Sequence, residues 1–432
     1  MMPLQYRARG ALSDLAVEIR NAILARRAPA SSETEATVAA LIADVRARSD
    51  AALRAQAREL DKVELSELEV PRTEWHRALG AIPPAVRLAL ERAAENIARV
   101  HAAWLPQRIE LEVQPGVRVV RRPIALARAG IYVPGGGAAY ASSLLMGVVP
   151  ARVAGVDEII VCTPPGASGR PADVLLAAAE IAGASRVFAV GGAGAIAAMT
   201  LGTASIPSVD CIAGPGNSYV TEAKLQLMRE VRVDLPAGPS ELLVIADDTA
   251  DLASVAAELL AQAEHGCDSA VVALAIGRGV AERLADAISD GISPLQRAET
   301  IRAALQRHGA LLEATSFEEG FAFAEEYAPE HLLLATRNAE HWAGAARNAG
   351  SVFVRGASVV YGDYLTGANH VLPTAGYART HSGLGTEFFM RWVTIQSVAP
   401  AAAREIAPIA ATLARAEGLD AHAAAALRAA GF

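Results

Sequence analysis

The sequence predicts an α/β protein built from two doubly wound, Rossmann-like units, with a helical N-terminal arm and a helical C-terminal tail. Short apolar runs rich in β-branched residues alternate with helical stretches through two regions, 129–241 and 242–376. Segments with helical periodicity lie outside these regions. The chain has 432 residues, 52% of them hydrophobic, which is enough for two or three domains with large cores.

The first part of the chain is expected to be helical. Residues 11–28 predict one helix within an N-terminal arm, 1–30. Between 33 and 105, charged faces alternate with Ala, Leu and Val faces at helical spacing, and two prolines break the pattern once. We assign 31–128 together with 242–376 to a first, discontinuous α/β domain.

The second α/β domain is expected at 129–241, and a parallel sheet of this kind binds ligands beyond the carboxyl ends of its strands. Its predicted strands are 158–163, 186–190 and 209–213, and its predicted helices are 143–154, 174–182 and 194–201. For the other domain, the predicted strands are 242–246, 269–275, 310–314, 331–335 and 351–354. The helices predicted between them are 251–265, 278–289, 293–307, 318–326 and 340–348, and 377–432 forms the helical tail.

Composition excludes several classes of protein. The net charge is −8 and there is no long basic run, which argues against a nucleic-acid surface. No window of roughly 18 apolar residues is free of charges or breaks, so we expect no membrane span. The N-terminus lacks the apolar core of a signal peptide, and three irregularly spaced cysteines fit a reduced compartment. We therefore expect a cytoplasmic protein.

The stretch LLAQAEHGCD, 259–268, ends a strongly predicted helix. Gln262 and His265 are three residues apart, so they share one face of its last turn. An amide oxygen beside an imidazole holds a metal or a polar substrate, or else it is an ordinary exposed helix end. Cys267 is a weaker candidate for a nucleophile, because no basic residue adjoins it.

Two further stretches place acids beside imidazoles. Glu330 and His331 follow a proline at the start of a predicted strand, where they are either an acid–base pair or a loop residue beside a half-buried histidine. The polar, turn-rich segment 361–374 carries Asp363, a candidate oxygen ligand, and His370, which is either a ligand or a structural residue.

Near the C-terminus, Glu417 and His422 are five residues apart. One continuous helix would turn them about 140° away from each other. Gly418 is expected to end one helix and Asp420 to cap the next, and this break lets both side chains face one site. Otherwise His422 is a surface residue.

Glycine-rich turns occur at 132–137, 190–198, 214–217 and 236–241, where backbone amides can approach a phosphate or a flat ring. Gly192, Gly194 and Ala197 match a G-x-G-x-x-A fingerprint between a predicted strand and a predicted helix. No convincing acidic residue follows at the expected distance, so the match alone is weak.

Seven motifs together resemble the histidinol dehydrogenase family, whose members depend on zinc and NAD. IYVPGG, GPGN.YVTEAK, AGPSE, LLAQAEHG, APEHL, GDY.TGANHVLPT and EGLDAH occur in the family's order and approximate spacing. The resemblance covers about 115–432 and loosely includes the helical part before it. It implies oxidation of L-histidinol to L-histidine through bound L-histidinaldehyde, with two NAD reduced in turn.

The resemblance also implies a role for each matching residue. The ligands of one Zn²⁺ per subunit would be Gln262, His265, Asp363 and His422, which together with His331 also hold the substrate. Glu417 and Ser240 would contact the substrate. Glu330 and His331 would carry the acid–base steps. Tyr132, Gly194 and Asn217 stand at the family's NAD contacts.

At one of these contacts the chain departs from the family, which usually has glutamine where this chain has Gly194. The sequence alone therefore predicts modestly weakened NAD affinity, which a Gly194→Gln change would improve. The neighbouring G-x-G-x-x-A match is then accidental. No cysteine lies in the motifs that carry chemistry, so we expect water, and not a thiol, to attack the aldehyde.

The family forms homodimers in which the tail of one subunit completes the other's site, and the apolar faces of the predicted tail helices agree with this. Two alternatives remain. One is a related zinc- and NAD-dependent enzyme of another small alcohol, similar to sulfopropanediol dehydrogenase, with Arg379 or Arg391 as the sulfonate contact. The other is a non-catalytic NAD- or metal-binding regulator.

Overall fold

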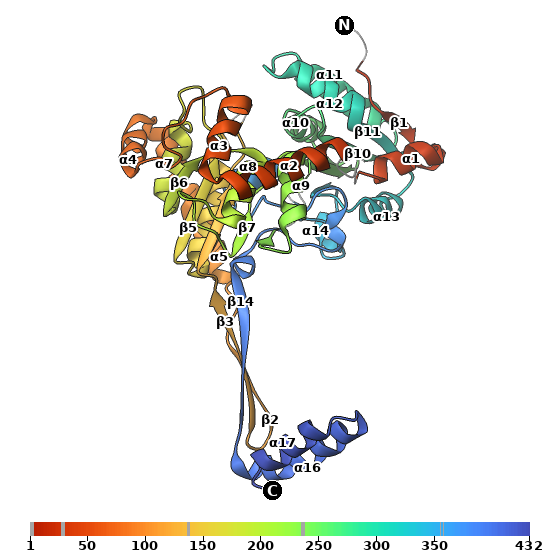
Figure 1. Cartoon of the computed structure of the whole chain (residues 1–432). Coiled ribbons are helices and arrows are strands. Elements are labelled where there is room, and N and C mark those ends of the chain that lie inside the picture. Colours follow the sequence, from red (N-terminus) through yellow and green to blue (C-terminus); the bar gives the residue numbers. More distant parts are fainter. Residues whose placement is uncertain (1–3, 27–30, 136–138, 235–237, 355, 357) are drawn as a thin grey trace.

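The computed structural model describes residues 4–26, 31–135, 139–234, 238–354, 356 and 358–432. Two α/β lobes lie side by side, and a long arm extends away from them to the C-terminal helices (Figure 1). Each lobe contains a parallel sheet, and the arm contains an antiparallel one. The predicted combination of two doubly wound units with helical termini is confirmed, and the arm is an addition to it.

A six-stranded parallel sheet forms the first lobe, with the strand order β1-β11-β10-β9-β12-β13. The strands are β1 (Ala8–Ala11), β9 (Glu241–Ala246), β10 (Ala270–Ile276), β11 (Gly309–Ala314), β12 (His331–Ala335) and β13 (Ser351–Phe353). Strands β9 and β10 are almost continuously apolar, because helices cover both faces of the sheet. The covering helices are α1 (Val17–Leu24), α10 (Leu252–Ala263), α11 (Val280–Ile292), α12 (Ala298–His308), α13 (Phe317–Tyr327) and α14 (Ala339–Ala343).

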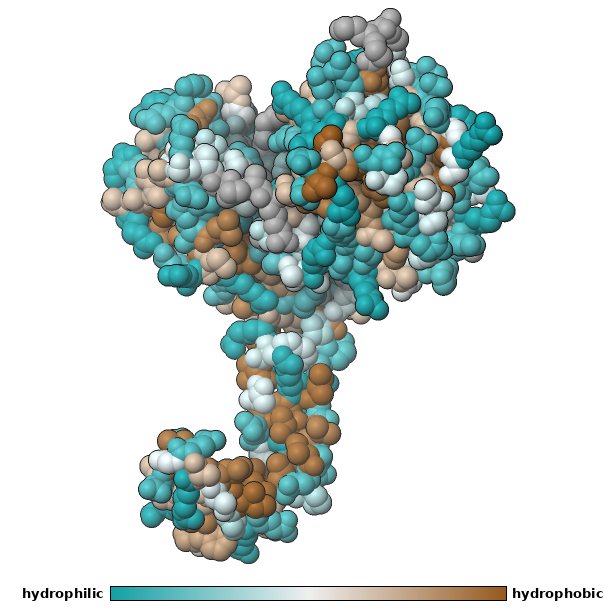
Figure 2. All heavy atoms as spheres, turned by 90° about the vertical axis from the view of Figure 1, so that its right-hand side faces the viewer, coloured by the Kyte–Doolittle hydropathy of each residue, from teal (hydrophilic) through white to brown (hydrophobic). Residues whose placement is uncertain are grey.

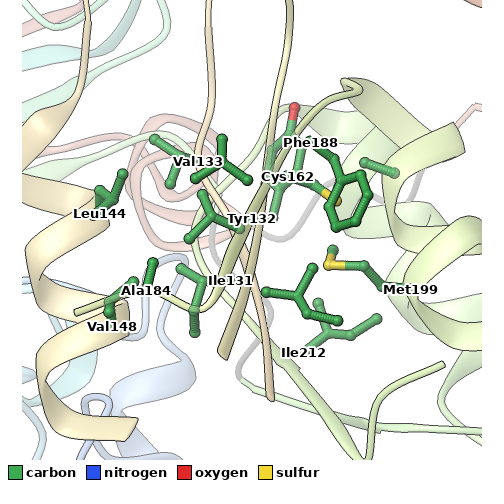
Figure 3. Close-up of a cluster of buried hydrophobic side chains, with 14 of the residues drawn as sticks. Ile131, Tyr132, Val133, Leu144, Val148, Cys162, Ala184, Phe188, Met199 and Ile212 are labelled. Carbon is green, nitrogen blue, oxygen red and sulfur yellow. The ribbon is translucent and has the colours of Figure 1, made fainter. Parts of the chain in front are cut away.

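A five-stranded parallel sheet forms the second lobe, with the order β6-β5-β4-β7-β8. The strands are β4 (Arg128–Tyr132), β5 (Glu158–Thr163), β6 (Arg186–Ala189), β7 (Cys211–Ala213) and β8 (Arg232–Val233). Helices α6 (Ala141–Ala154), α7 (Asp173–Ala182), α8 (Gly192–Leu201) and α9 (Ser218–Leu227) connect them. Figure 3 shows Leu144 and Val148 of α6 on one side of Ile131, and Phe188 and Met199 on the other, so both faces of β4 are buried.

The N-terminal helical segment packs on this second lobe. It comprises α2 (Ser32–Arg48), α3 (Asp50–Gln56), the π-helical turn η2 (Ala57–Asp61), α4 (Arg72–Ala81) and α5 (Pro84–Ala103). Its apolar residues, including Val38, Leu53, Trp75 and Ile97, share one hydrophobic core with β4 and β5. The expected grouping of 31–128 with 242–376 therefore differs from the packing, because an apolar helix face fits either sheet and the pattern does not say which.

The N-terminal arm also differs from the expectation of a single helix. Strand β1 pairs in parallel with β11 at the edge of the six-stranded sheet, and the 3-10 turn η1 (Leu12–Asp14) separates it from α1. Four residues are too few for strand alternation to stand out, so tertiary pairing decides this element. Residues 27–30, at the end of the predicted helix, lie outside the described part of the chain.

The arm is a three-stranded antiparallel sheet with the order β14-β3-β2. Its strands are β2 (Ile109–Gln114), β3 (Val117–Ala125) and β14 (Met390–Val398), followed by helices α16 (Pro400–Ala416) and α17 (Asp420–Ala429). The tail helices were expected, but β14 was not, because a strand whose partner lies some 270 positions earlier has no local signature. Gly418 ends the first helix in the left-handed conformation, as predicted, while Asp420 begins α17 and does not cap it.

Shorter elements complete the lobes: α15 (Val359–Tyr364), η3 (Tyr377–Arg379) and η4 (Thr386–Phe389). The predicted helix start at Asp251 is confirmed by its cap, because Asp251 accepts a hydrogen bond from the N–H of Ala253. Asn217 caps α9, a helix that was not predicted, by accepting one from the N–H of Val220. In the described ranges, no helix has the length and apolar character needed to cross a membrane.

Candidate active site

Glu330 and His331 lie at the start of strand β12, in the six-stranded sheet of the first lobe. His331 is the first residue of β12, which pairs with β9, so the pair lies against the amino end of β9. Glu330 Oε2 accepts hydrogen bonds from the hydroxyl of Ser240 at 3.0 Å and from the N–H of Glu241 at 2.7 Å. Both side chains are almost completely buried. The sequence placed this pair at a strand start but did not show what holds it.

The environment of the pair prepares both groups for proton transfer. Burial raises the pKa of Glu330 well above its usual range, although the bonds from Glu241 and Ser240 oppose the rise. Burial lowers the pKa of His331, so its imidazole is neutral near pH 7. Nδ1 of His331 donates a hydrogen bond to the carbonyl of Glu241, 3.0 Å away. Nε2 therefore carries the lone pair of a general base.

Asp363 lies on the other side of His331. Its Oδ1 is 4.0 Å from Nε2 of His331, at the end of the short helix α15. His370 supports this turn, because its Nδ1 lies 2.9 Å from the carbonyl of Asp363 and its Nε2 lies 3.3 Å from the hydroxyl of Ser143. Both ring nitrogens of His370 thus have protein partners, which favours its structural interpretation over that of a metal ligand.

Gln262 and His265 reach the same region from the end of α10. Gln262 is buried, and its Nε2 has no hydrogen-bond partner among the described residues. Nδ1 of His265 faces the carbonyl of Ala261 at 3.1 Å, so Nε2 is the ring nitrogen that is available to a ligand. His265 is close enough to His331 to contribute to the lowering of the pKa of His331. Imidazole nitrogen and carboxylate oxygen are ligand types that Zn²⁺ takes. Within the described part of this single chain, however, no three His, Cys, Asp or Glu side chains are grouped closely enough to hold a metal ion.

An ion pair that sequence reasoning missed anchors the Glu330–His331 pair. Glu241, whose backbone holds both Glu330 and His331, has its own carboxylate bound by Nε of Arg26 at 2.7 Å. Arg26 also donates to the carbonyl of Tyr327 and lies over that ring, 3.3 Å from its centre. Glu241 stands in the AGPSE motif, which was a usable signal, but nothing local in the sequence points to Arg26.

The predicted cofactor residues gather at the carboxyl edge of the five-stranded sheet, as expected for a doubly wound unit. Tyr132 ends β4, and its hydroxyl accepts a hydrogen bond from the N–H of Gly192, at the start of α8. Burial raises the pKa of Tyr132 to about 12, so the phenol stays protonated. Asn217 is the exposed cap of α9, after β7.

A buried ion pair shapes the GPGN turn before Asn217. Gly214 has φ +122°, and a Cβ there would overlap the carbonyl oxygen of Tyr132, so only glycine fits. Asp234 accepts a hydrogen bond from the N–H of Gly214. Lys224 donates to the carbonyl of Gly214 and also to the carboxylate of Asp234, at 2.6 Å. Lys224 belongs to a motif already noted, so its role was visible in principle.

Glu417 and His422 are not brought together with the other candidates. Both are exposed on the two tail helices at the far end of the arm, away from the lobe that carries Glu330 (Figure 1). The break at Gly418 is present, but the other candidate residues of this chain lie in the lobes and not at the end of the arm. Arg379, a candidate for a sulfonate contact, donates to the carbonyl of Glu326, and Arg391 is exposed on β14.

Comparisons with known proteins agree with this arrangement. A family model described as histidinol dehydrogenase matches residues 24–429. The chain belongs to the histidinol dehydrogenase family. Histidinol dehydrogenase from Xylella fastidiosa is 45% identical over 396 residues, covering 91% of this chain and 92% of the relative. The enzyme of that name from Methanosarcina mazei is 42% identical over 389 residues, covering 90% of each chain.

A solved structure extends the likeness to three dimensions. The crystal structure of histidinol dehydrogenase from Elizabethkingia anophelis superposes with a TM-score of 0.92 at 34% sequence identity, and 98% of each chain is covered. The family match therefore includes both lobes, the arm and the tail helices. The resemblance inferred from seven short motifs is confirmed over almost the whole chain.

Proposed function

We propose that this protein oxidises L-histidinol to L-histidine through bound L-histidinaldehyde, reducing two NAD, as the last step of histidine biosynthesis. The observation that carries the proposal is the buried Glu330–His331 pair beside Asp363 in a chain of this family. The pair has the opposite pKa perturbations that acid–base catalysis requires. The alternative with a sulfonated diol has less support, because Arg379 already has a carbonyl partner.

Each residue has a definite task in this reaction. His331 Nε2 takes the proton of the substrate hydroxyl as a hydride leaves the carbon. Bound NAD supplies the acceptor for that hydride. Glu330 takes a proton from water as the water oxygen adds to the aldehyde carbon, and protonated His331 returns its proton to the aldehyde oxygen. His331, neutral again, then takes a hydroxyl proton of the hydrate during the second hydride transfer. Ser240, hydrogen-bonded to Glu330, orients the carboxyl and contacts the substrate.

Zinc(II) is the metal that this site would hold, with Gln262, His265, Asp363 and His422 as its four ligands. When bound, it supplies a Lewis-acid centre that fixes the substrate's imidazole and amine. Tyr132 and Asn217 are proposed to bind NAD at the edge of the five-stranded sheet. The expected compartment remains the cytoplasm, where thiols stay reduced.

We further propose a homodimer in which the arm of one subunit completes the site of the other. Large apolar side chains are exposed along the arm: Ile109, Leu111, Val113, Ile395, Val398, Ile409 and Leu413. Figure 2 shows hydrophobic surface along the arm and at its end. A cavity of about 510 Å³, with apolar walls from α5 and α6, borders Asp363. A partner's tail would cover such surfaces and bring Glu417 and His422 to Asp363.

Stoichiometry and metal dependence test the proposal together. We expect two NADH for each L-histidinol, loss of this activity after chelation, and its recovery with Zn²⁺. The measurement is absorbance at the NADH band with limiting substrate, with a mock-treated sample as the control. Zinc-bound protein that oxidises a sulfonated diol and not histidinol would transfer the proposal to the alternative substrate, and zinc binding without turnover of any alcohol would support a regulator.

The water route predicts that the cysteines are dispensable. Burial raises the pKa of Cys162 strongly and that of Cys211 to about 12, so neither is a thiolate near neutral pH. A triple change of Cys162, Cys211 and Cys267 to alanine should keep kcat within about twofold, since no thiol forms a covalent intermediate. Circular dichroism confirms that the variant is folded. A folded triple variant without turnover would show that a thiol takes part.

A further inference from the structure

In the first turn of α8, a side chain at Gly194 would meet the side chain of Gln56. The family usually has glutamine at this position. A Cβ built there would overlap Oε1 of Gln56 and would lie 3.1 Å from Cδ of that residue. It would also lie 3.4 Å from Cδ2 of Leu53, one turn earlier on α3. The amide of Gln56 thus occupies the space next to α8 that a residue at position 194 would use.

Gln56 is an unusual residue for its position. It is the last residue of α3 and is 8% exposed, among apolar residues of the second lobe's core. Its Nε2 is buried without a hydrogen-bond partner in the described part of the chain. An unpaired buried amide N–H is costly, so such a group calls for an acceptor, which an ordered water or a ligand supplies.

The surroundings of Gln56 belong to the predicted cofactor site. Gly194 lies in the same turn as Gly192, whose N–H binds the hydroxyl of Tyr132. Asp61, at the end of the π-helical turn that follows Gln56, is close enough to contribute to the raised pKa of Tyr132. Gln56, the start of α8 and Tyr132 are therefore neighbours at the carboxyl edge of the five-stranded sheet.

We propose that Gln56 is a cofactor-binding residue: it replaces the missing side chain at position 194 and donates its amide N–H to an acceptor oxygen of NAD. The inference rests on the proposed use of NAD. Gly194 is then a requirement and not a defect, because glycine makes room for an amide that comes from another helix. This replaces the expectation of weakened NAD affinity.

A Gln56→Met variant tests the donor. Methionine keeps the length of the side chain and removes its hydrogen-bonding groups. We expect Kd and KM for NAD to rise about tenfold, the effect of losing one hydrogen bond, while kcat and the KM of the alcohol stay within about twofold. Gln56→Leu is the second variant should the first be unstable. The control is Gln306→Met, on the exposed face of α12.

A swap tests the shared space. Gly194→Gln alone should lower NAD affinity, because the new side chain must displace Gln56. Gln56→Ala combined with Gly194→Gln should return Kd for NAD to within about threefold of the wild type, since one amide again fills one space. If the double variant instead loses as much NAD affinity as the two single variants together, the proposal that Gln56 replaces a side chain at position 194 is contradicted.

NAD titration by calorimetry and steady-state kinetics separate the possible failures. If the wild type neither binds nor reduces NAD, the proposed function fails and this inference fails with it. If the wild type binds NAD, and folded Gln56→Met and Gln56→Leu proteins bind it equally well, Gln56 only fills space and the inference alone is overturned. Raised Kd with unchanged kcat, together with recovery in the double variant, supports it.

Discussion

Replacing Glu330 with glutamine is expected to lower steady-state kcat for histidinol oxidation by about a thousandfold. Glutamine keeps the size of the side chain, and its oxygen still accepts the bonds from Ser240 and the Glu241 N–H, so the site keeps its shape. It has no basic oxygen to take a proton from water. The addition of water to the aldehyde, which separates the two hydride transfers, should therefore become very slow.

This variant separates the two oxidations. Because His331 serves the first oxidation, rapid mixing of Glu330→Gln protein with substrate should produce one NADH per site quickly and the second very slowly. His331→Asn should slow both phases, since it removes the base with its free Nε2. Glu318→Gln, an exposed change on α13, is the matched control. Two NADH at the wild-type rate from Glu330→Gln protein would contradict water activation by Glu330.

Replacing His422 with alanine should abolish nearly all activity, although this residue lies at the far end of the arm in its own subunit. The proposed reason is that it ligates zinc in the partner's site. Loss of one of four ligands should reduce bound zinc and lower kcat by about a hundredfold or more. Zinc content by atomic absorption and activity are the measurements. His76→Ala, on the exposed face of α4, is the control.

Mixed dimers decide whether the tail acts on its own subunit or on the partner. Protein carrying Glu330→Gln keeps a normal tail, and protein carrying His422→Ala keeps a normal lobe. If the tail acts on the partner, each mixed dimer has one intact site, and an equal mixture should recover about a quarter of wild-type activity. If the tail acts within its own subunit, every site carries one defect and no activity returns. Differently tagged subunits allow the mixed dimer to be isolated and assayed directly.

The grouping of candidate residues was predictable where their motifs are local. Glu330 with His331 and Gln262 with His265 are close in sequence, so spacing alone indicated shared faces and adjacent roles. The contacts around them were not predictable in the same way. Arg26 reaches Glu241 from 215 positions away, and no short-range pattern encodes that pairing.

Gln56 and Gly194 show the same limit at the cofactor site. On the sequence, the glycine was a missing contact, and the glutamine was one polar residue among many on a charged helix. Only the packing of α3 against α8 places the amide over the glycine. A residue from another element can thus offset a substitution. A motif does not reveal this, because it compares one sequence position at a time.

The kinds of elements and the parallel character of the sheets in both lobes followed from local pattern, because helix periodicity, continuous apolar strands and capping are short-range effects. The roles proposed for the site residues rest on the family resemblance. Three features needed the tertiary structure: the attachment of 32–103 to the second lobe, strand β1 at a sheet edge, and the arm that carries Glu417 and His422 away from their own lobe. Each of these features depends on which two apolar surfaces pack together. The hydrophobic effect is non-directional, so many pairs of apolar surfaces satisfy the same sequence pattern. Only the packing of the whole molecule determines which pair forms.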